Sequence, residues 1–119
     1  MSETATLQEI RLALGREPAL RLFRNQVGAL KDITGRVVHF GLHRGSSDLI
    51  GWRSVTITPD MVGQTVAVFA ACEVKAPAGR HPVTPEQQHF LEVVQAAGGL
   101  AGVARNVGQA RHILGLPPA

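Results

Sequence analysis

The sequence predicts a mixed α/β fold in which a central sheet is flanked by helices. An apolar run from Val66 to Cys72 leads directly into Glu73-Val74-Lys75, as expected for a strand that is buried on both faces. The segment Thr84-Pro85-Glu86-Gln87 combines an N-cap, a proline at the first helical position and a capping-box glutamine. A short apolar strand follows at residues 100–104. The helix after Thr84 is therefore expected to be a crossover between two parallel strands.

The first half of the chain is expected to hold one helix and two or three strands. Ser2 can cap a helix that extends to Leu14, although Thr6 and Glu9 also match a capping box that begins four residues later. Residues 20–24 alternate apolar with basic side chains, which is typical of a half-exposed strand. The remaining segments are a polar connection (residues 25–35), a short strand or extended arm (36–40), a loop (41–47) and a strand that opens at residue 48 and can reach residue 57.

The second half supplies the elements of the predicted core. The central strand is expected at about residues 65–75, and the helix after Thr84 ends at Gly98-Gly99. Asn106 can cap a last helix. On the first of these helices Gln87, Phe90, Leu91 and Val94 are expected to share one face. On the last, the residues expected to face inward are Val107, Ala110 and Leu114. The predicted order is helix, strand, strand, strand, helix, strand, helix.

Composition narrows the class of protein. The 119 residues are enough for one domain with a modest core, and 45% apolar against 18% charged residues excludes a disordered chain. A single cysteine excludes an internal disulfide and suits a reducing compartment. No apolar run approaches the roughly 18 residues of a membrane helix, and no signal pattern opens the chain. We therefore expect a soluble, cytoplasmic domain over residues 1–119, whose net charge of +3 favours an anionic partner.

Three groups that could carry chemistry are Asp48, Glu73 and Lys75. In a strand Glu73 and Lys75 project from one face, and a neighbouring strand can bring Asp48 within range of the same cation. Magnesium prefers carboxylate and carbonyl oxygens, so the Val74 carbonyl is a further candidate ligand. Lys75 could orient a water molecule or stabilise charge on a phosphate. The alternatives are a plain Glu73–Lys75 ion pair and a turn role for Asp48.

The wider pattern resembles the VRR-NUC family of the PD-(D/E)xK nuclease superfamily. The resemblance covers nearly the whole chain and rests on Arg24-Asn25-Gln26-Val27-Gly28, the segment from Gly41 to Gly51, Cys72-Glu73-Val74-Lys75, Gly79-Arg80, Thr84-Pro85-Glu86-Gln87 and the segment from Ala97 to Ala101. It implies a restriction-endonuclease-like αβββαβ core with a mixed central sheet. Ser47 stands where the superfamily has a proline before the aspartate.

The resemblance also implies roles for individual residues. Asp48 and Glu73 match the metal-binding acids, Lys75 the catalytic lysine and Gln87 the helical glutamine of the site. Gln87 could instead complete the capping box, and both roles can hold only if its side chain shares or alternates partners. Glu3 is preferred over Glu9 as the acidic residue of the first helix. The residues expected to contact DNA are Arg24, Asn25, Arg36, His43, Arg44, Ser46, Arg80 and His81.

The function implied by the resemblance is that of a Mg²⁺- or Mn²⁺-dependent DNA endonuclease. Standalone members of the family are minimal, and some cleave four-way junctions as homodimers, so a structure-selective junction resolvase is expected. The alternatives are a flap- or end-directed nuclease and an inactive DNA-binding module of the same fold.

Overall fold

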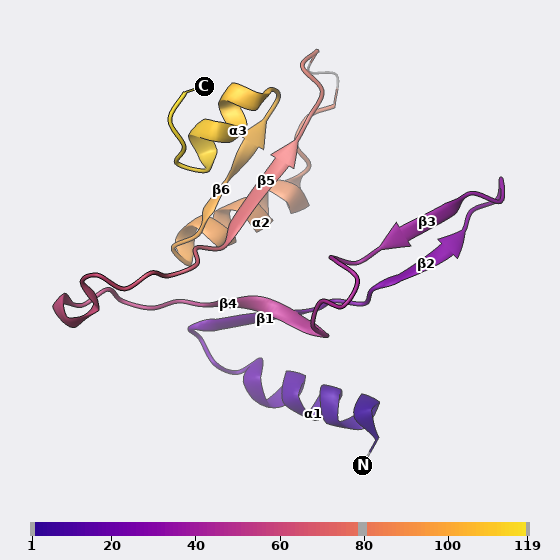
Figure 1. The fold of residues 1–119 in the computed structure, drawn as a ribbon, viewed down its shortest axis with the longest axis horizontal. Coiled ribbons are helices and arrows are strands. Elements are labelled where there is room, and N and C mark those ends of the chain that lie inside the picture. Colours follow the sequence, from indigo (N-terminus) through magenta and orange to yellow (C-terminus); the bar gives the residue numbers. More distant parts are fainter. Residues whose placement is uncertain (1, 79–80, 119) are drawn as a thin grey trace. The chain divides into compact units, whose positions relative to one another are not determined.

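The computed structural model describes residues 2–78 and 81–118 and divides the chain into two compact units, Met1–Val55 and Thr56–Ala119. The first unit contains α1 (Glu3–Leu14), β1 (Leu20–Arg24), β2 (Gly28–Lys31), β3 (Val37–Phe40) and β4 (Leu49–Arg53). The second contains a 3₁₀ turn, η1 (Pro59–Met61), β5 (Ala70–Val74), α2 (Pro85–Ala96), β6 (Leu100–Ala104) and α3 (Val107–Ile113) (Figure 1). The predicted mixed α/β class is confirmed.

The first helix begins where the earlier of its two predicted caps stands. The hydroxyl of Ser2 accepts the backbone N–H of Ala5 at 3.1 Å, which satisfies one of the free donors of the first turn. The later start at Thr6 is wrong, because Thr6 is already inside the helix and its N–H donates to the Ser2 carbonyl. No residue of α1 is buried.

Strands β1 and β4 form an antiparallel pair in the first unit. The register runs from Leu20 opposite Arg53 to Arg24 opposite Leu49. A side chain at Gly51 would put its Cβ 1.8 Å from the carbonyl oxygen of Arg21, so only glycine fits this position. The bounds of β1 agree with the prediction, whereas β4 ends at Arg53, well before residue 57.

The second antiparallel pair joins β2 and β3, of which the sequence predicts only β3. Residues 37–40 form the expected short strand, and its partner is residues 28–31, where the sequence predicts a polar connection. Asp32 starts the connecting turn: its carbonyl accepts the N–H of Gly35, and its carboxylate accepts the N–H groups of Thr34 and Arg36. Gly35 has a φ of 85°, as a glycine that closes such a hairpin requires.

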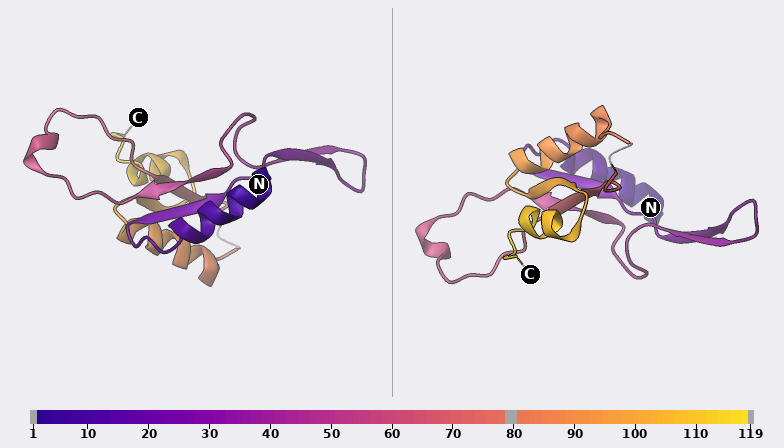
Figure 2. Two further views of the ribbon diagram at one scale, coloured as in Figure 1. Left: turned by 90° about the horizontal axis from the view of Figure 1, so that it is seen from below. Right: turned by 90° about the horizontal axis from the view of Figure 1, so that it is seen from above.

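The second unit contains the predicted parallel crossover. Strand β5 pairs in parallel with β6 from Ala70 opposite Leu100 to Val74 opposite Ala104, and α2 connects them. Helices α2 and α3 lie on opposite faces of this two-stranded sheet (Figure 2). Leu91 and Val94 of α2 and Ala104 of β6 are the buried apolar residues among those described.

The prediction of a long central strand buried on both faces is wrong. Strand β5 begins at Ala70, and Val68 before it is 50% exposed. Within the strand, Cys72 is exposed and Val74 is 73% exposed. The reason is that β5 pairs along one edge alone among the described strands, and α3 packs on β6. Cys72, which a strand buried on both faces would place in the core, therefore lies on the exposed face of β5.

Of the three positions of the last helix that were expected to face inward, Val107 is exposed, whereas Ala110 and Leu114 are half-buried. On α2, Leu91 and Val94 are buried, Gln87 is half-buried and Phe90 is 39% exposed. Of the helices described, none has the length and apolar character needed to cross a membrane.

Candidate active site

Glu73 and Lys75 lie at the C-terminal end of β5 and share the face that α2 covers. Burial alternates along this strand, so Ala71, Glu73 and Lys75 are half-buried while the residues between them are exposed. The side chain of Lys75 is 13% exposed and that of Glu73 is 30% exposed. The N–H of Lys75 donates to the carbonyl of Ala104 at 3.0 Å, which continues the ladder past the end of the strand. The spacing of two residues therefore places both charges together, as predicted.

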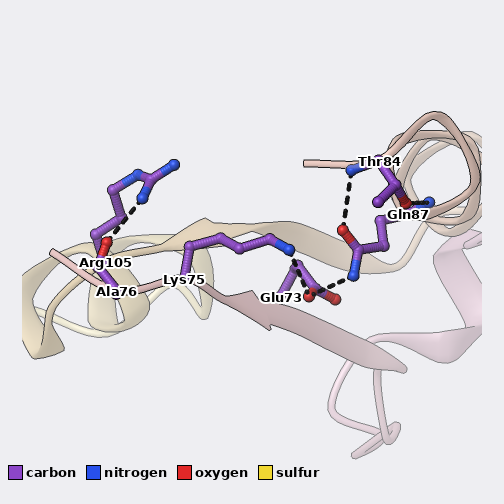
Figure 3. A network of polar contacts seen from close by, with 6 residues as sticks. All are labelled: Glu73, Lys75, Ala76, Thr84, Gln87 and Arg105. Carbon is purple, nitrogen blue, oxygen red and sulfur yellow. Dashed lines mark hydrogen bonds and ion pairs between the residues drawn. The ribbon is translucent and has the colours of Figure 1, made fainter. Parts of the chain in front are cut away.

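Gln87 reaches this pair from the first turn of α2. Its amide oxygen accepts the N–H of Thr84 at 3.0 Å, and the hydroxyl of Thr84 accepts the N–H of Gln87 at 3.1 Å, which completes a capping box. The amide nitrogen of Gln87 donates to Glu73 Oε1 at 2.9 Å (Figure 3). The side chain of Gln87 is therefore shared between two partners, because its oxygen serves the cap and its nitrogen serves Glu73.

Both partners of Glu73 act on the same oxygen. Lys75 Nζ lies 3.7 Å from Glu73 Oε1, a distance typical of an ion pair and too long for a good hydrogen bond. Gln87 donates to that oxygen as well. Among the described residues, Glu73 Oε2 has no hydrogen-bond partner. The carboxylate is thus held through one oxygen and offers the other.

The Val74 carbonyl is directed away from the neighbouring strand. In a strand the backbone groups of successive residues point to opposite edges. Phe69 and Lys75 bond to β6 through their carbonyl and N–H groups respectively, so Glu73 also points toward β6 and Val74 points to the other edge. No described strand pairs along that edge. Glu73 Oε2 and the Val74 carbonyl are therefore two oxygen donors at one strand end, a donor set that suits Mg²⁺ or Mn²⁺.

The other predicted acidic ligands belong to the first unit. Asp48 is exposed and directly precedes β4, and its carbonyl accepts the N–H of Asn25 at 2.8 Å. Glu3 and Glu9 are both exposed on α1, with Glu3 in its first turn. Across residues 2–78 and 81–118, no three His, Cys, Asp or Glu side chains are grouped in a way that could hold a metal ion. The roles of Asp48 and Glu3 stay predictions.

The residues expected to contact DNA fall into three groups. The exposed ones are Arg24, Arg36, His43, Arg44 and His81. Ser46 is half-buried, and its hydroxyl accepts a hydrogen bond from the amide of Asn25, which is itself buried. Arg80 lies outside the described residues.

Arg105 is a charged residue near the site that the sequence analysis did not single out. Arg105 Nη1 donates to the carbonyl of Ala76 at 2.7 Å and so ties the chain just after Lys75 to the end of β6 (Figure 3). Because Val74 is opposite Ala104 in a parallel pair, the residues that follow them, Lys75 and Arg105, stand opposite each other just past the ends of the two strands. The sequence contains a signal for a charged residue at this strand end, since an arginine directly follows the apolar strand at residues 100–104.

The sequence matches the VRR-NUC domain family over residues 4–108, which is most of the chain and includes Asp48, Glu73, Lys75 and Gln87. No curated protein and no solved structure gives a significant match. The chain belongs to the VRR-NUC family of nuclease domains.

Proposed function

We propose that this domain is a metal-dependent DNA endonuclease whose reaction is centred on Glu73 and Lys75. The observation that carries the proposal is the convergence of Gln87 and Lys75 on a single oxygen of Glu73. Hydrogen bonds of this kind fix the orientation of a metal-binding carboxylate and are a usual part of metal sites. A plain structural ion pair would not need a third residue to hold the carboxylate.

The cation would be held by three oxygen donors: the carboxylates of Asp48 and Glu73 and the carbonyl of Val74. Glu73 and Val74 fit this role, because each presents an oxygen that is not used within the β5–β6 sheet. Asp48 is a proposed partner on the strength of the family match and its exposure beside β4. A divalent cation at this position would supply positive charge to the phosphate that is cleaved.

Lys75 would act on the reacting phosphate. Its side chain is mostly buried, and Glu73 holds the ammonium on the α2 side of the strand. A fixed, partly desolvated positive charge stabilises the extra negative charge that a phosphodiester gains as water attacks. Glu73 would therefore have two tasks, which are to bind the cation and to hold the Lys75 ammonium in place.

For the substrate we propose branched DNA, with a four-way junction as the preferred form. Exposed basic residues, among them Arg24, Arg36 and Arg44, suit contacts with phosphates, which carry no sequence information. A homodimer with twofold symmetry would present two such sites to two strands of a symmetric junction. Structure-selective cutting follows from that arrangement.

The test is cleavage of a labelled four-way junction beside linear duplex, flap and single-stranded DNA, each with Mg²⁺, Mn²⁺ or EDTA. We expect the junction to be cut when metal is present and to stay intact in EDTA. Cutting of flaps or ends alone would keep the nuclease and overturn the junction preference. Tight DNA binding without any metal-dependent cutting would indicate an inactive binding module.

A further inference from the structure

Asn25 is the one buried polar residue among those described, with 8% of its surface exposed. It directly follows β1, and its backbone N–H donates to the carbonyl of Asp48 at 2.8 Å. This bond extends the β1–β4 ladder by one pair beyond Arg24 and Leu49. The backbone of Asp48 is therefore attached to β1 through Asn25.

The side chain of Asn25 joins the two ends of the loop that precedes Asp48. Its oxygen accepts the N–H of Leu42 at 3.0 Å, near the start of the loop. Its nitrogen donates to the hydroxyl of Ser46 at 2.7 Å and to the carbonyl of Ser47 at 3.0 Å, near the end. The Leu42 N–H can only donate and the Ser47 carbonyl can only accept, so the orientation of the amide is fixed by its partners.

The loop itself is tightly folded around this amide. The N–H of Ser46 donates to the carbonyl of His43 at 2.8 Å, and Gly45 within this turn has a φ of 87°. Gly41 has a φ of 84°, and a Cβ there would lie 2.5 Å from the carbonyl oxygen of Gln26. Residues 41–48 thus form a closed turn that depends on hydrogen bonds to Asn25.

These contacts leave Asn25 without a donor for DNA. An asparagine amide nitrogen has two hydrogens, and both are used by Ser46 and Ser47. A phosphate would also have to reach a side chain that is buried. The direct DNA contact expected for Asn25 is therefore disfavoured, and its contacts favour a role in holding Asp48 instead.

We propose that Asn25 is a positioning residue, whose buried amide fixes the 41–48 loop and so holds the Asp48 carboxylate in place for the cation. The proposal rests on the proposed function, because it assumes that Asp48 is a metal ligand. Mutation of a residue that orients a metal ligand typically lowers metal affinity or activity by about 10- to 100-fold.

The test compares Asn25→Asp with Gln26→Glu. Asn25→Asp keeps an oxygen for the Leu42 N–H and removes both donors to Ser46 and Ser47. Gln26→Glu makes the same change from amide to carboxylate at the next residue, which is exposed. The measurements are Mn²⁺ affinity by calorimetry, kcat and KM for junction DNA, and hydrogen exchange of the Leu42 amide.

For Asn25→Asp we expect Mn²⁺ affinity and kcat to fall by at least about tenfold. KM for DNA should stay unchanged, Leu42 should exchange faster, and excess Mn²⁺ should partly restore kcat. Gln26→Glu should resemble the wild type in each measurement. Wild-type Mn²⁺ affinity in Asn25→Asp, or a raised KM with unchanged kcat, would overturn the positioning role.

If Asn25→Asp does not fold, Ser46→Ala takes its place, since it removes one acceptor and leaves the amide of Asn25 intact. This variant should also bind Mn²⁺ more weakly than the wild type, and unchanged affinity would contradict the proposal. A wild-type protein that cuts DNA with metal while Asn25→Asp is unaffected overturns the positioning role alone. A wild type without metal-dependent cutting overturns both proposals.

Discussion

The amide nitrogen of Gln87 lies 2.9 Å from Glu73 Oε1, while the oxygen of the same amide accepts the backbone N–H of Thr84. The first turn of α2 and the end of β5 are therefore joined through one side chain. Because a backbone N–H can only donate, the Thr84 contact determines which end of the amide faces Glu73. The cap of the helix thus sets the orientation of the candidate metal ligand.

The first prediction separates the two roles of Gln87 with Gln87→Glu and Thr84→Ala. Gln87→Glu keeps an oxygen for the Thr84 N–H, but it removes the donor to Glu73 and places a second carboxylate beside it. We expect metal-dependent cleavage to fall by about 10- to 100-fold in this variant. Thr84→Ala keeps the donor and removes the side-chain cap, so it should lower the free energy of unfolding by about 1 kcal/mol with turnover close to the wild-type value.

Cleavage rates and thermal unfolding measured on both variants check this prediction. Equal losses of turnover in the two variants would show that Gln87 serves the helix alone.

The second prediction concerns Lys75→Met, which keeps most of the length of the side chain and removes its charge. We expect kcat to fall by about 10²- to 10³-fold, because a fixed charge beside the reacting phosphate is lost. The free energy of unfolding should change by less than about 1 kcal/mol, since the Glu73–Lys75 pair is too long for a good hydrogen bond and Glu73 keeps the hydrogen bond from Gln87. Single-turnover cleavage and DNA binding measured together check this, and unchanged cleavage would remove Lys75 from the reaction.

The third prediction is that Arg44, exposed at the tip of the 41–48 loop, contacts a DNA phosphate. Arg44→Ala should weaken binding to every DNA sequence and reduce the slope of log affinity against log salt by about one. The slope is measured from DNA binding between about 50 and 200 mM salt. Arg16→Ala, at an exposed position between α1 and β1, is the control and should leave the slope unchanged. Equal slopes for wild type and Arg44→Ala would count against the contact.

The fourth prediction is a pH effect at the β2–β3 turn. The side-chain hydrogen bond from Thr34, followed by the backbone N–H of Arg36, lowers the pKa of Asp32 below its ordinary value of 3.8. A carboxylate with a lowered pKa stabilises the fold above its unfolded-state pKa, and this stabilisation is lost as the pH falls through the folded-state pKa. The turn should therefore be less stable at acidic pH.

The backbone amide shifts of Thr34 and Arg36, followed by NMR from about pH 6 to pH 2, report this transition. Asp32→Asn keeps an acceptor oxygen and cannot titrate, so its amide shifts should stay flat. The same titration in wild type and variant would contradict the assignment.

Elements with local signals were predicted well from the sequence. Ser2, Thr84 and Asn106 each accept an N–H of the first helical turn, and such caps need only a few neighbouring residues. The β2–β3 hairpin also has a local signal, an aspartate and a glycine three residues apart, which is typical of a turn.

Features that depend on neighbouring elements were predicted less well. An apolar run shows that residues favour burial, but the burial of Val68 and Cys72 depends on how many strands and helices surround β5. In the candidate site, too, the feature set by local spacing was predictable and the feature that depends on packing was not. The spacing of Glu73 and Lys75 predicted a shared face, whereas the two-ended use of the Gln87 amide requires knowing where α2 packs.

In the proposed mechanism, Glu73 holds the cation on which DNA cleavage depends. The most direct measurement is a calorimetric titration of Mn²⁺ into the wild type and into Glu73→Gln, with cleavage of junction DNA by the same samples. We expect Glu73→Gln to bind Mn²⁺ at least about tenfold more weakly and to lose cleavage. Wild-type Mn²⁺ affinity together with undiminished cleavage in Glu73→Gln would contradict the account.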